Sequence, residues 1–324
     1  MPFDTQTIIS IASYGGAGAC MGLGAIGAAL GVGYTGGLAN EALSQKPEVS
    51  GTIVKNMLIG QAIAESAAIF ALVIAVLLIY LSPPVTNLLT ASALGAAGLC
   101  MGFGAIGSGV GSGFPAGEVC LAIVRQPAIT GRLTTNMLIG SAVCQTPAIF
   151  AMVVALMLMF LDVNNLSVNP TWAALLGAGL STGLAAVGSG LGGGLAGGAS
   201  VSGIARQPET FGKVTTIMLV GQAVSQTPAI FGLLVSFILM FKAFPETTSI
   251  AAPMALLGAG ISMGFGGIGP GIGNGFTAQS AVKWVARNEE ASGILTRVML
   301  VGQAVSQSTA IYAMVVSLVL IFVI

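Results

Sequence analysis

The sequence contains no histidine and very little charge. Charged residues make up 6% of the chain, against roughly 25% in an ordinary soluble domain. Without histidine there are no imidazole bases, no histidine metal ligands and no Ser-His or Cys-His nucleophile pairs. Ten basic residues balance ten acidic residues, so the chain offers no basic surface for nucleic acid. These absences exclude a soluble globular domain, imidazole-based catalysis and a nucleic-acid partner.

Cysteine is also scarce. The four cysteines, Cys20, Cys100, Cys120 and Cys144, lie in apolar stretches at spacings that match neither a disulfide framework nor a zinc site. We interpret them as small packing residues. The N-terminal MPFDTQT has no lysine or arginine before the first apolar run, which is unlike a signal or transit peptide. We therefore expect the first apolar segment to be a retained membrane helix.

Apolar residues and glycine dominate the chain. Hydrophobic residues make up 55%, the mean hydropathy is +0.97, and there are 48 glycines. The glycines lie within long apolar segments, so neither a collagen-like nor a disordered chain fits this composition. A sequence of this kind is typical of a protein embedded in a bilayer.

The chain is one unit written four times. LIGQAIAESAAIF, LIGSAVCQTPAIF, LVGQAVSQTPAIF and LVGQAVSQSTAIY begin at residues 58, 138, 219 and 300. Each block follows a glycine-rich apolar segment and a short polar link; the links are SQKPE (44–48), RQPAI (125–129), RQPET (206–210) and RNEEA (287–291). We therefore predict an all-α integral membrane protein with eight transmembrane helices in four tandem hairpins. The expected hairpins span 1–84, 85–166, 167–247 and 248–324.

Basic residues predict the orientation. Nine of the ten surround the links: Lys46, Lys55, Arg125, Arg132, Arg206, Lys213, Lys283, Arg287 and Arg297. By the positive-inside rule the links face the cytoplasm and both termini face the opposite side. The arms exceed the roughly 20 residues that cross a hydrocarbon core, so they project beyond the bilayer. All repeats share one orientation, which argues against an inverted-repeat transporter.

Glycines two residues apart recur in each first arm, as at Gly109, Gly111 and Gly113. Residues two apart on a helix point about 200° apart, so two opposite flanks lack side chains and can approach neighbouring helices closely. This pattern favours a ring with the glycine-rich arms inside over simple pairing within each hairpin. Three segments also match the dinucleotide fingerprint GxGxxG, but they fall within membrane-helix patterns, so we do not expect nucleotide binding.

Glu65 is the acid at membrane depth. If the second arm of hairpin 1 spans about 51–81, Glu65 lies near its centre, about 22 Å from the link. An ionised side chain there costs at least ~2.5 kcal/mol, and no basic residue occurs at comparable depth. A carboxyl that is protonated toward lipid and ionised toward water or a cation can carry an ion. The alternative is a permanently neutral glutamate hydrogen-bonded between helices.

The glycine-rich arms, the RQP links and GQAIAES around Glu65 resemble the c subunit, or proteolipid, of rotary F-type ATP synthases and related ATPases. The resemblance covers essentially the whole chain. It implies a non-catalytic rotor subunit in a bacterial plasma membrane. The subunit would form a ring with identical chains, which could also include other c subunits. It implies a stator a subunit whose arginine meets each carboxylate, and a central stalk that contacts the links. The matching stalk-contact residues are Gln45, Lys46, Pro47, Arg125, Gln126, Pro127, Arg206, Gln207 and Pro208.

The chain departs from this family at three of its four carrier positions. Gln145, Gln226 and Gln307 align with Glu65. An amide keeps the size and hydrogen-bonding capacity of the acid but has no proton to titrate, so three hairpins are silent. Two silent hairpins carry Pro147 and Pro228 two residues later, which favours a local kink in each.

Glu118 is the other acid within an apolar arm, about two turns from the second link. Its aligned residues, Leu38, Ala199 and Ser280, are not acidic. Long polar side chains near a helix end reach the interface. We therefore interpret Glu118 as a solvated or link-paired group and not as a transport site.

The surroundings of Glu65 favour protons over sodium. Gln61 and Ile63 precede it on the same arm and Ser66 follows it. Sodium-binding members of the family resemble one another in a glutamine on the glycine-rich arm, a serine or threonine after the glutamate and a tyrosine five residues after it. Ser66 matches the second feature, but the other two positions hold Val32 and Phe70. We therefore expect no cofactor and no bound metal, with Na⁺ at Glu65 as the alternative.

Neighbouring hairpins could supply further oxygens for sodium at Glu65, through Ser112 or Asn274. Two other classes also stay open. One is a structural or pore-forming proteolipid in which Glu65 is inert. The other is a conventional transporter with one substrate cavity, which the repetition of the polar positions disfavours.

Overall fold

The computed structural model describes residues 4–80 and 87–323, and every regular element in these ranges is a helix. The first arms are α1 (Thr5–Gln45), α3 (Leu88–Arg125), α6 (Val168–Arg206) and α8 (Ala251–Val285). The second arms are α2 (Ser50–Tyr80), α4 (Thr130–Cys144) with α5 (Thr146–Met159), α7 (Phe211–Phe241) and α9 (Ser292–Phe322). Eight helical segments in the described ranges are long and apolar enough to cross a membrane. The predicted all-α membrane fold is confirmed.

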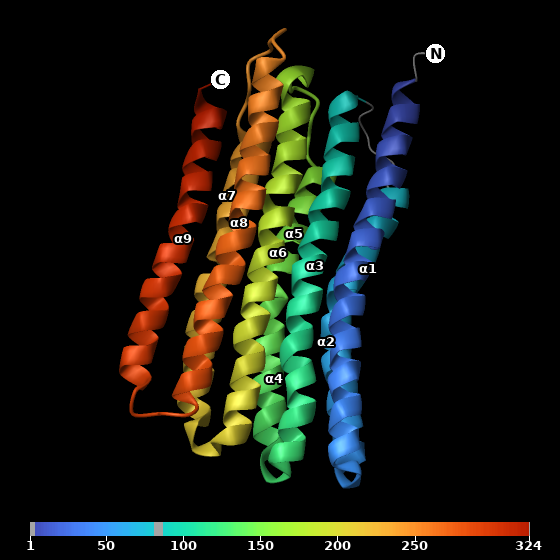
Figure 1. The fold of residues 1–324 in the computed structure, drawn as a ribbon. Helices are drawn as coiled ribbons and strands as arrows, with labels where there is room; N and C mark the ends of the chain where they lie inside the picture. Colours follow the sequence, from blue (N-terminus) through green and yellow to red (C-terminus); the bar gives the residue numbers. More distant parts are fainter. Residues whose placement is uncertain (1–3, 81–86, 324) are drawn as a thin grey trace.

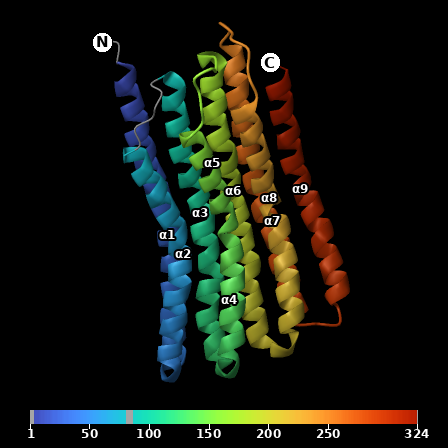
Figure 2. The ribbon, with the colours of Figure 1, turned by 180° about the vertical axis from the view of Figure 1, so that it is seen from behind.

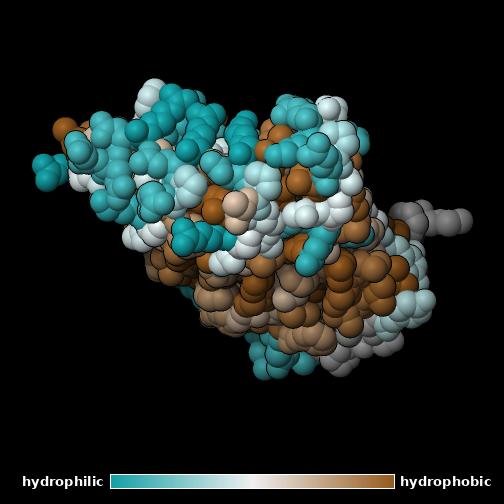
Figure 3. Space-filling model, turned by 90° about the horizontal axis from the view of Figure 1, so that it is seen from below, coloured by the Kyte–Doolittle hydropathy of each residue, from teal (hydrophilic) through white to brown (hydrophobic). Residues whose placement is uncertain are grey.

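The hairpins stand side by side, with the links at one end and both chain termini at the other (Figure 1). The predicted boundary between the first two hairpins, at residues 84 and 85, lies outside the described residues, as does the start of the MPFDTQT segment. Seen from the link end, hydrophilic side chains gather at this end and hydrophobic side chains cover a flank of the molecule (Figure 3). This distribution suits helices that cross a bilayer and project from it on the link side.

Proline ends the first arm of three hairpins. Lys46, Gln126 and Gln207 have ψ between 74° and 87°, because a residue that precedes proline is pushed out of the α region. The prolines then open short 3₁₀ turns, Pro47–Val49, Pro127–Ile129 and Pro208–Thr210. The fourth link lacks proline and has no such turn between α8 and α9.

The helices form two layers. In the first layer α1, α3, α6 and α8 pack in sequence, each against the next (Figure 1). In the second layer, seen from behind in Figure 2, α2 packs against α1 and α3, α4 and α5 pack against α3 and α6, and α7 packs against α6 and α8. Each of these second arms therefore lies in the groove between its own first arm and that of the next hairpin. The last second arm, α9, packs against α8 and α7.

Glycine makes the first layer possible. A Cβ at Gly98 would collide with the backbone of Gly16, and a Cβ at Gly190 would collide with the backbone of Gly107. Helix α3 has two such flanks, since Gly98 faces α1 while Gly107 faces α6. Without a hydrophobic driving force between helices in lipid, close van der Waals packing of this kind holds them together. The two glycine flanks predicted from the sequence are confirmed.

The two silent hairpins with proline differ in their second arms. In hairpin 2 the arm is interrupted at Gln145, between α4 and α5, and Pro147 lies in the first turn of α5. In hairpin 3 the helix α7 runs through Pro228 without interruption. In both, a serine hydroxyl of the first arm accepts a hydrogen bond from the backbone N–H that follows the proline, at 3.1 Å from Ala148 to Ser108 and 3.2 Å from Ala229 to Ser189.

Candidate functional site

Glu65 is the sixteenth residue of the 31-residue helix α2 and is exposed in the single chain. Within the described residues it has no hydrogen bond and no ion pair. Its predicted neighbours are occupied with backbone groups of the same hairpin. The Ser66 hydroxyl donates to the Ile63 carbonyl at 2.7 Å, and the Gln61 amide donates to the Val32 carbonyl at 3.1 Å.

The silent positions are enclosed. Gln145, Gln226 and Gln307 are no more than 8% exposed. The Gln145 amide donates to the Ile63 carbonyl at 2.9 Å and to the Ser112 hydroxyl at 2.7 Å. The Gln226 amide donates to the Val143 carbonyl at 2.8 Å. The amides of Gln145 and Gln226 therefore join their own hairpins to the second arm of the hairpin before.

Hairpin 4 reaches the preceding hairpin through a different residue. The Asn274 amide donates to the Val224 carbonyl at 3.3 Å and to the Gln307 side-chain oxygen at 2.8 Å. Ile63, Val143 and Val224 occupy equivalent places in the repeat, two residues before the carrier position. Ser112 and Asn274, which the sequence offered as oxygens for Glu65, thus lie beside Gln145 and Gln307.

A second layer of amides repeats the same arrangement one turn closer to the links. The Gln222 amide donates to Gly193 on its own first arm at 2.9 Å and to Gly140 on the preceding hairpin at 3.0 Å. The Gln303 amide donates to Asn274 and to Gly221, both at 3.1 Å. Gln61 makes the bond to its own first arm, and within the described residues it makes no second one.

Each repeat site is therefore built from one hairpin and the second arm of the hairpin before it. Within the described residues no second arm lies before hairpin 1, so its site lacks that neighbouring wall there. This explains why Glu65 is exposed while the aligned glutamines are buried. The backbone carbonyls of Val143 and Val224 were not predicted from the sequence, because a carbonyl is present at every residue and only the packing selects one.

The link residues lie together at the far end of the hairpins. Gln45 donates to Glu41 at 3.2 Å, while Arg125 and Arg206 are the last residues of α3 and α6. The fourth link is different. Arg287 stacks on Trp284 at 4.7 Å, and Glu289 pairs with Lys213 of the third hairpin at 2.9 Å. Among the described residues no group of three potential histidine, cysteine or acidic metal ligands occurs.

The sequence is similar to proteins of one family throughout its length. The model of the ATP synthase C-subunit family matches four times, at residues 15–78, 95–158, 176–239 and 257–320. The K subunit of the A-type ATP synthase of Methanocaldococcus jannaschii is 31% identical over 197 residues, which are 61% of this chain and 82% of that relative. The c subunit of the ATP synthase of Petrotoga mobilis is 52% identical over 68 residues, 21% of this chain and 71% of that relative. The chain therefore belongs to the ATP synthase C-subunit family, with the hairpin of that family repeated four times in tandem.

Proposed function

We propose that the chain is a rotor-ring subunit that carries protons through Glu65, one carrier for each four hairpins. The observation that supports this most directly is the contrast at the four aligned positions. The three glutamine amides are buried and hydrogen-bonded, whereas the Glu65 side chain is exposed in the single chain. The chain has no catalytic role of its own; it couples ion movement to ATP synthesis or hydrolysis elsewhere in the complex.

Protons fit the surroundings of Glu65 better than sodium. Sodium needs several oxygen ligands, yet Val32 and Phe70 supply none from their side chains. A carboxyl needs only one acceptor for its proton when it faces lipid.

Two variants and one reagent test the carrier. Glu65→Gln should abolish ATP-driven proton movement to background while the ring still assembles, since the amide is close to isosteric. Glu118→Gln is the control and should keep transport. A hydrophobic carbodiimide should label Glu65 in the wild type, less so as the pH rises, with no protection by Na⁺. Transport by Glu65→Gln would contradict the carrier role, and protection by Na⁺ would identify sodium as the ion.

A second copy of the chain would complete the Glu65 site. The place of Ile63, Val143 and Val224 is held in hairpin 4 by Val305, and that of Gly140 and Gly221 by Gly302. In a head-to-tail ring the α9 helix of the preceding copy would therefore offer the Val305 carbonyl to Glu65. The Gly302 carbonyl would be the second acceptor for Gln61. Head-to-tail contacts of this kind close into rings when the rotation allows it.

The two ends of the first layer are complementary. In α1 a Cβ at Gly22 or Gly37 would meet no heavy atom of the described residues within 4 Å. The aligned glycines in α3, Gly102 and Gly117, pack against side chains of α1, Leu23 and Tyr34 respectively. The residues of α8 that align with Leu23 and Tyr34 are Phe265 and Phe276, which are 61% and 58% exposed. Each phenylalanine would cover the matching glycine of the next copy.

The mass of the detergent-extracted complex tests this assembly. We expect closed rings of identical chains, and a variant with Phe265→Ala and Phe276→Ala should dissociate at lower detergent concentration. Monomers that retain transport activity, or rings in which a second c-type protein is required for closure, would contradict a ring of this chain alone.

The orientation and the remaining partners follow from the links. The basic residues support links on the cytoplasmic side of a bacterial plasma membrane, in contact with a central stalk, and both termini on the opposite side. The stator a subunit would bring an arginine to Glu65 during rotation. A membrane-impermeant thiol reagent should label Lys46→Cys from the cytoplasmic side and Glu246→Cys from the other. The reverse pattern would overturn the assignment.

A further inference from the structure

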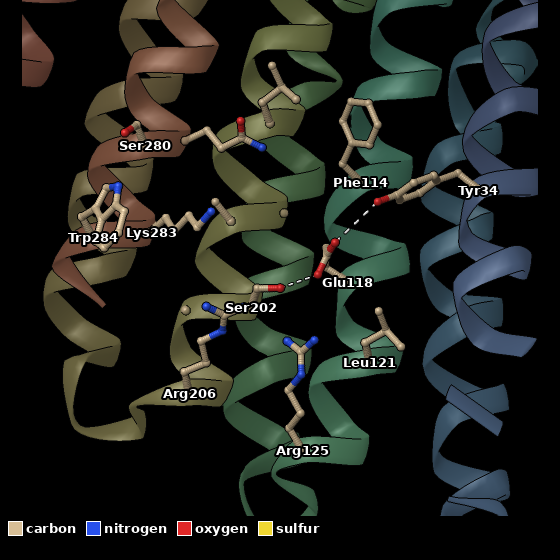
Figure 4. Close-up of a pocket in the computed structure, with 15 residues that line it drawn as sticks. Tyr34, Phe114, Glu118, Leu121, Arg125, Ser202, Arg206, Ser280, Lys283 and Trp284 are labelled. Carbon is tan, nitrogen blue, oxygen red and sulfur yellow. Dashed lines mark hydrogen bonds between the residues drawn. The ribbon is translucent and has the colours of Figure 1, made fainter. Parts of the chain in front are cut away.

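A pocket of about 520 Å³ opens near the link end, on the face of the first layer that is turned away from the second arms (Figure 4). Its walls come from α1, α3, α6 and α8. All of its lining residues belong to one chain, and Glu65 is not among them.

The pocket holds more positive than negative charge. Arg125, Arg206 and Lys283 line it from three different hairpins, and Glu118 is the one acid among its lining residues. In Figure 4 the two guanidinium groups extend from the link end toward Glu118 and Ser202. Within the described part of the chain none of the three cations forms a salt bridge. The pocket therefore carries about two uncompensated positive charges.

Glu118 is committed to neighbours of its own. One carboxylate oxygen accepts a hydrogen bond from the Tyr34 hydroxyl at 3.5 Å, and the other accepts a bond from the Ser202 hydroxyl (Figure 4). The sequence predicted a solvated or link-paired group, but its partners are instead side chains of α1 and α6. The carboxylate thus accepts bonds from two hydroxyls and, within the described residues, forms no salt bridge with Arg125 or Arg206.

The positive charge of the pocket comes from hairpins 2 to 4. The place of Lys283 is held in the other hairpins by Glu41, Leu121 and Ser202. The place of Arg125 and Arg206 is held in hairpin 1 by Gln45. Hairpin 4 has Arg287 at the same place, outside the pocket, so Lys283 is the one cation of the pocket without a basic counterpart in another hairpin.

We propose that this pocket binds the phosphate of an anionic phospholipid. Guanidinium forks match the geometry of phosphate oxygens, and basic pockets between transmembrane helices on the cytoplasmic side bind anionic headgroups. Glu118 offsets one of the three cations, which leaves enough charge for a single phosphodiester. Phe114 and Leu195 line the side of the pocket farther from the links, where acyl chains would lie. This apolar wall favours a lipid over free phosphate.

Native mass spectrometry of the full chain in neutral detergent tests the proposal. The probes are phosphatidylglycerol, phosphatidylcholine and inorganic phosphate. The pocket variant is Arg125→Gln with Arg206→Gln, and the matched control is Lys55→Gln with Arg297→Gln, which removes the same charge from the exposed face of α2 and α9. Circular dichroism checks that both variants keep the helical content of the wild type.

We expect the wild type and the control to bind phosphatidylglycerol in preference to phosphatidylcholine, and the pocket variant to bind it at least about tenfold more weakly. Glu118→Gln should bind it more tightly, because one negative charge is removed from the pocket. Equal binding by the two double variants would overturn the proposal. Inorganic phosphate that competes as well as the lipid would also overturn it, and so would a wild type that binds no phosphatidylglycerol. Loss of stalk subunits from the complex of the pocket variant, with lipid binding unchanged, would assign the cations to the stalk instead.

Discussion

Restoring a carboxyl at a silent position should affect stability differently in hairpins 2 and 3. The Gln145 amide group donates two hydrogen bonds, one to Ile63 and one to Ser112. The Gln226 amide group donates one, to Val143. A protonated carboxyl has a single O–H to donate. Gln145→Glu therefore loses one donated bond, whereas Gln226→Glu can keep the one that it has.

The expected difference follows from the value of one buried hydrogen bond, about 1 kcal/mol. We expect Gln145→Glu to lower the free energy of unfolding by about that amount more than Gln226→Glu. An ionised carboxyl at either position would cost at least ~2.5 kcal/mol, so the introduced group should stay protonated while it is enclosed. Denaturant unfolding of the purified chain, followed by circular dichroism, measures both variants.

The same variants test whether the silent positions can carry ions. In the reconstituted complex each variant has two carboxyls per chain, so the number of ions moved per ATP should double. Equal destabilisation of the two variants, or a larger loss in Gln226→Glu, would refute the assignment of hydrogen bonds to these amides. An unchanged ion count would show that the backbone around the silent positions prevents exchange with the stator.

Three further predictions concern packing and energy conversion. Gly98→Ala should destabilise the chain by about 1–3 kcal/mol, because the new Cβ meets the backbone of Gly16. Gly95→Ala on the same helix is the control: its Cβ meets nothing within 4 Å, so it should stabilise the chain by about 1 kcal/mol. Thermal unfolding that ranks the two variants the other way would contradict the glycine flank. Ser108→Ala should lower the free energy of unfolding by about 1–3 kcal/mol, because the Ala148 N–H loses its acceptor. The Ser92 hydroxyl bonds to carbonyls of its own helix, so Ser92→Ala should be close to neutral in the same assay. Vesicles with this chain as the sole c-type subunit should show ATP-driven proton pumping and little ATP synthesis at a modest imposed potential, and robust synthesis there would refute the count of one carrier per chain.

Internal repetition is what made the fold predictable. Four copies of one motif fix the arms, the links and their common orientation without knowledge of any contact. The central depth of Glu65 follows from the same alignment, and α2 places it at the middle of its helix. The glycine flanks could also be predicted, because the positions of the glycines in the sequence determine which faces of the helix have no side chains.

The partners of the site were less predictable, because they depend on how one hairpin lies against the next. The sequence identified Gln145 as silent but not the Ile63 carbonyl as its acceptor. It offered Ser112 to Glu65, whereas the packing gives Ser112 to Gln145. Proline predicted a kink in two second arms; the helix is interrupted at Gln145 in the arm with Pro147 and is continuous through Pro228, and the bend in each arm stays a prediction. Such choices are made by backbone groups, which have the same chemistry at every position of the sequence.

With Glu65 as the proposed carrier, glutamine at the three aligned positions changes the energetics of the rotor. Each charge that crosses the membrane exchanges about 2.3 kcal/mol per 100 mV, while the ATP made or used per turn is set by the catalytic part of the complex. A ring with one carrier per four hairpins moves few ions in each turn, so a turn in the synthesis direction collects little energy. In the hydrolysis direction the same ratio concentrates the energy of ATP on fewer ions and allows pumping against a steeper gradient. Gln145 and Gln226 donate hydrogen bonds to the hairpin before their own, so under the proposed function the number of carriers can fall without loss of these contacts.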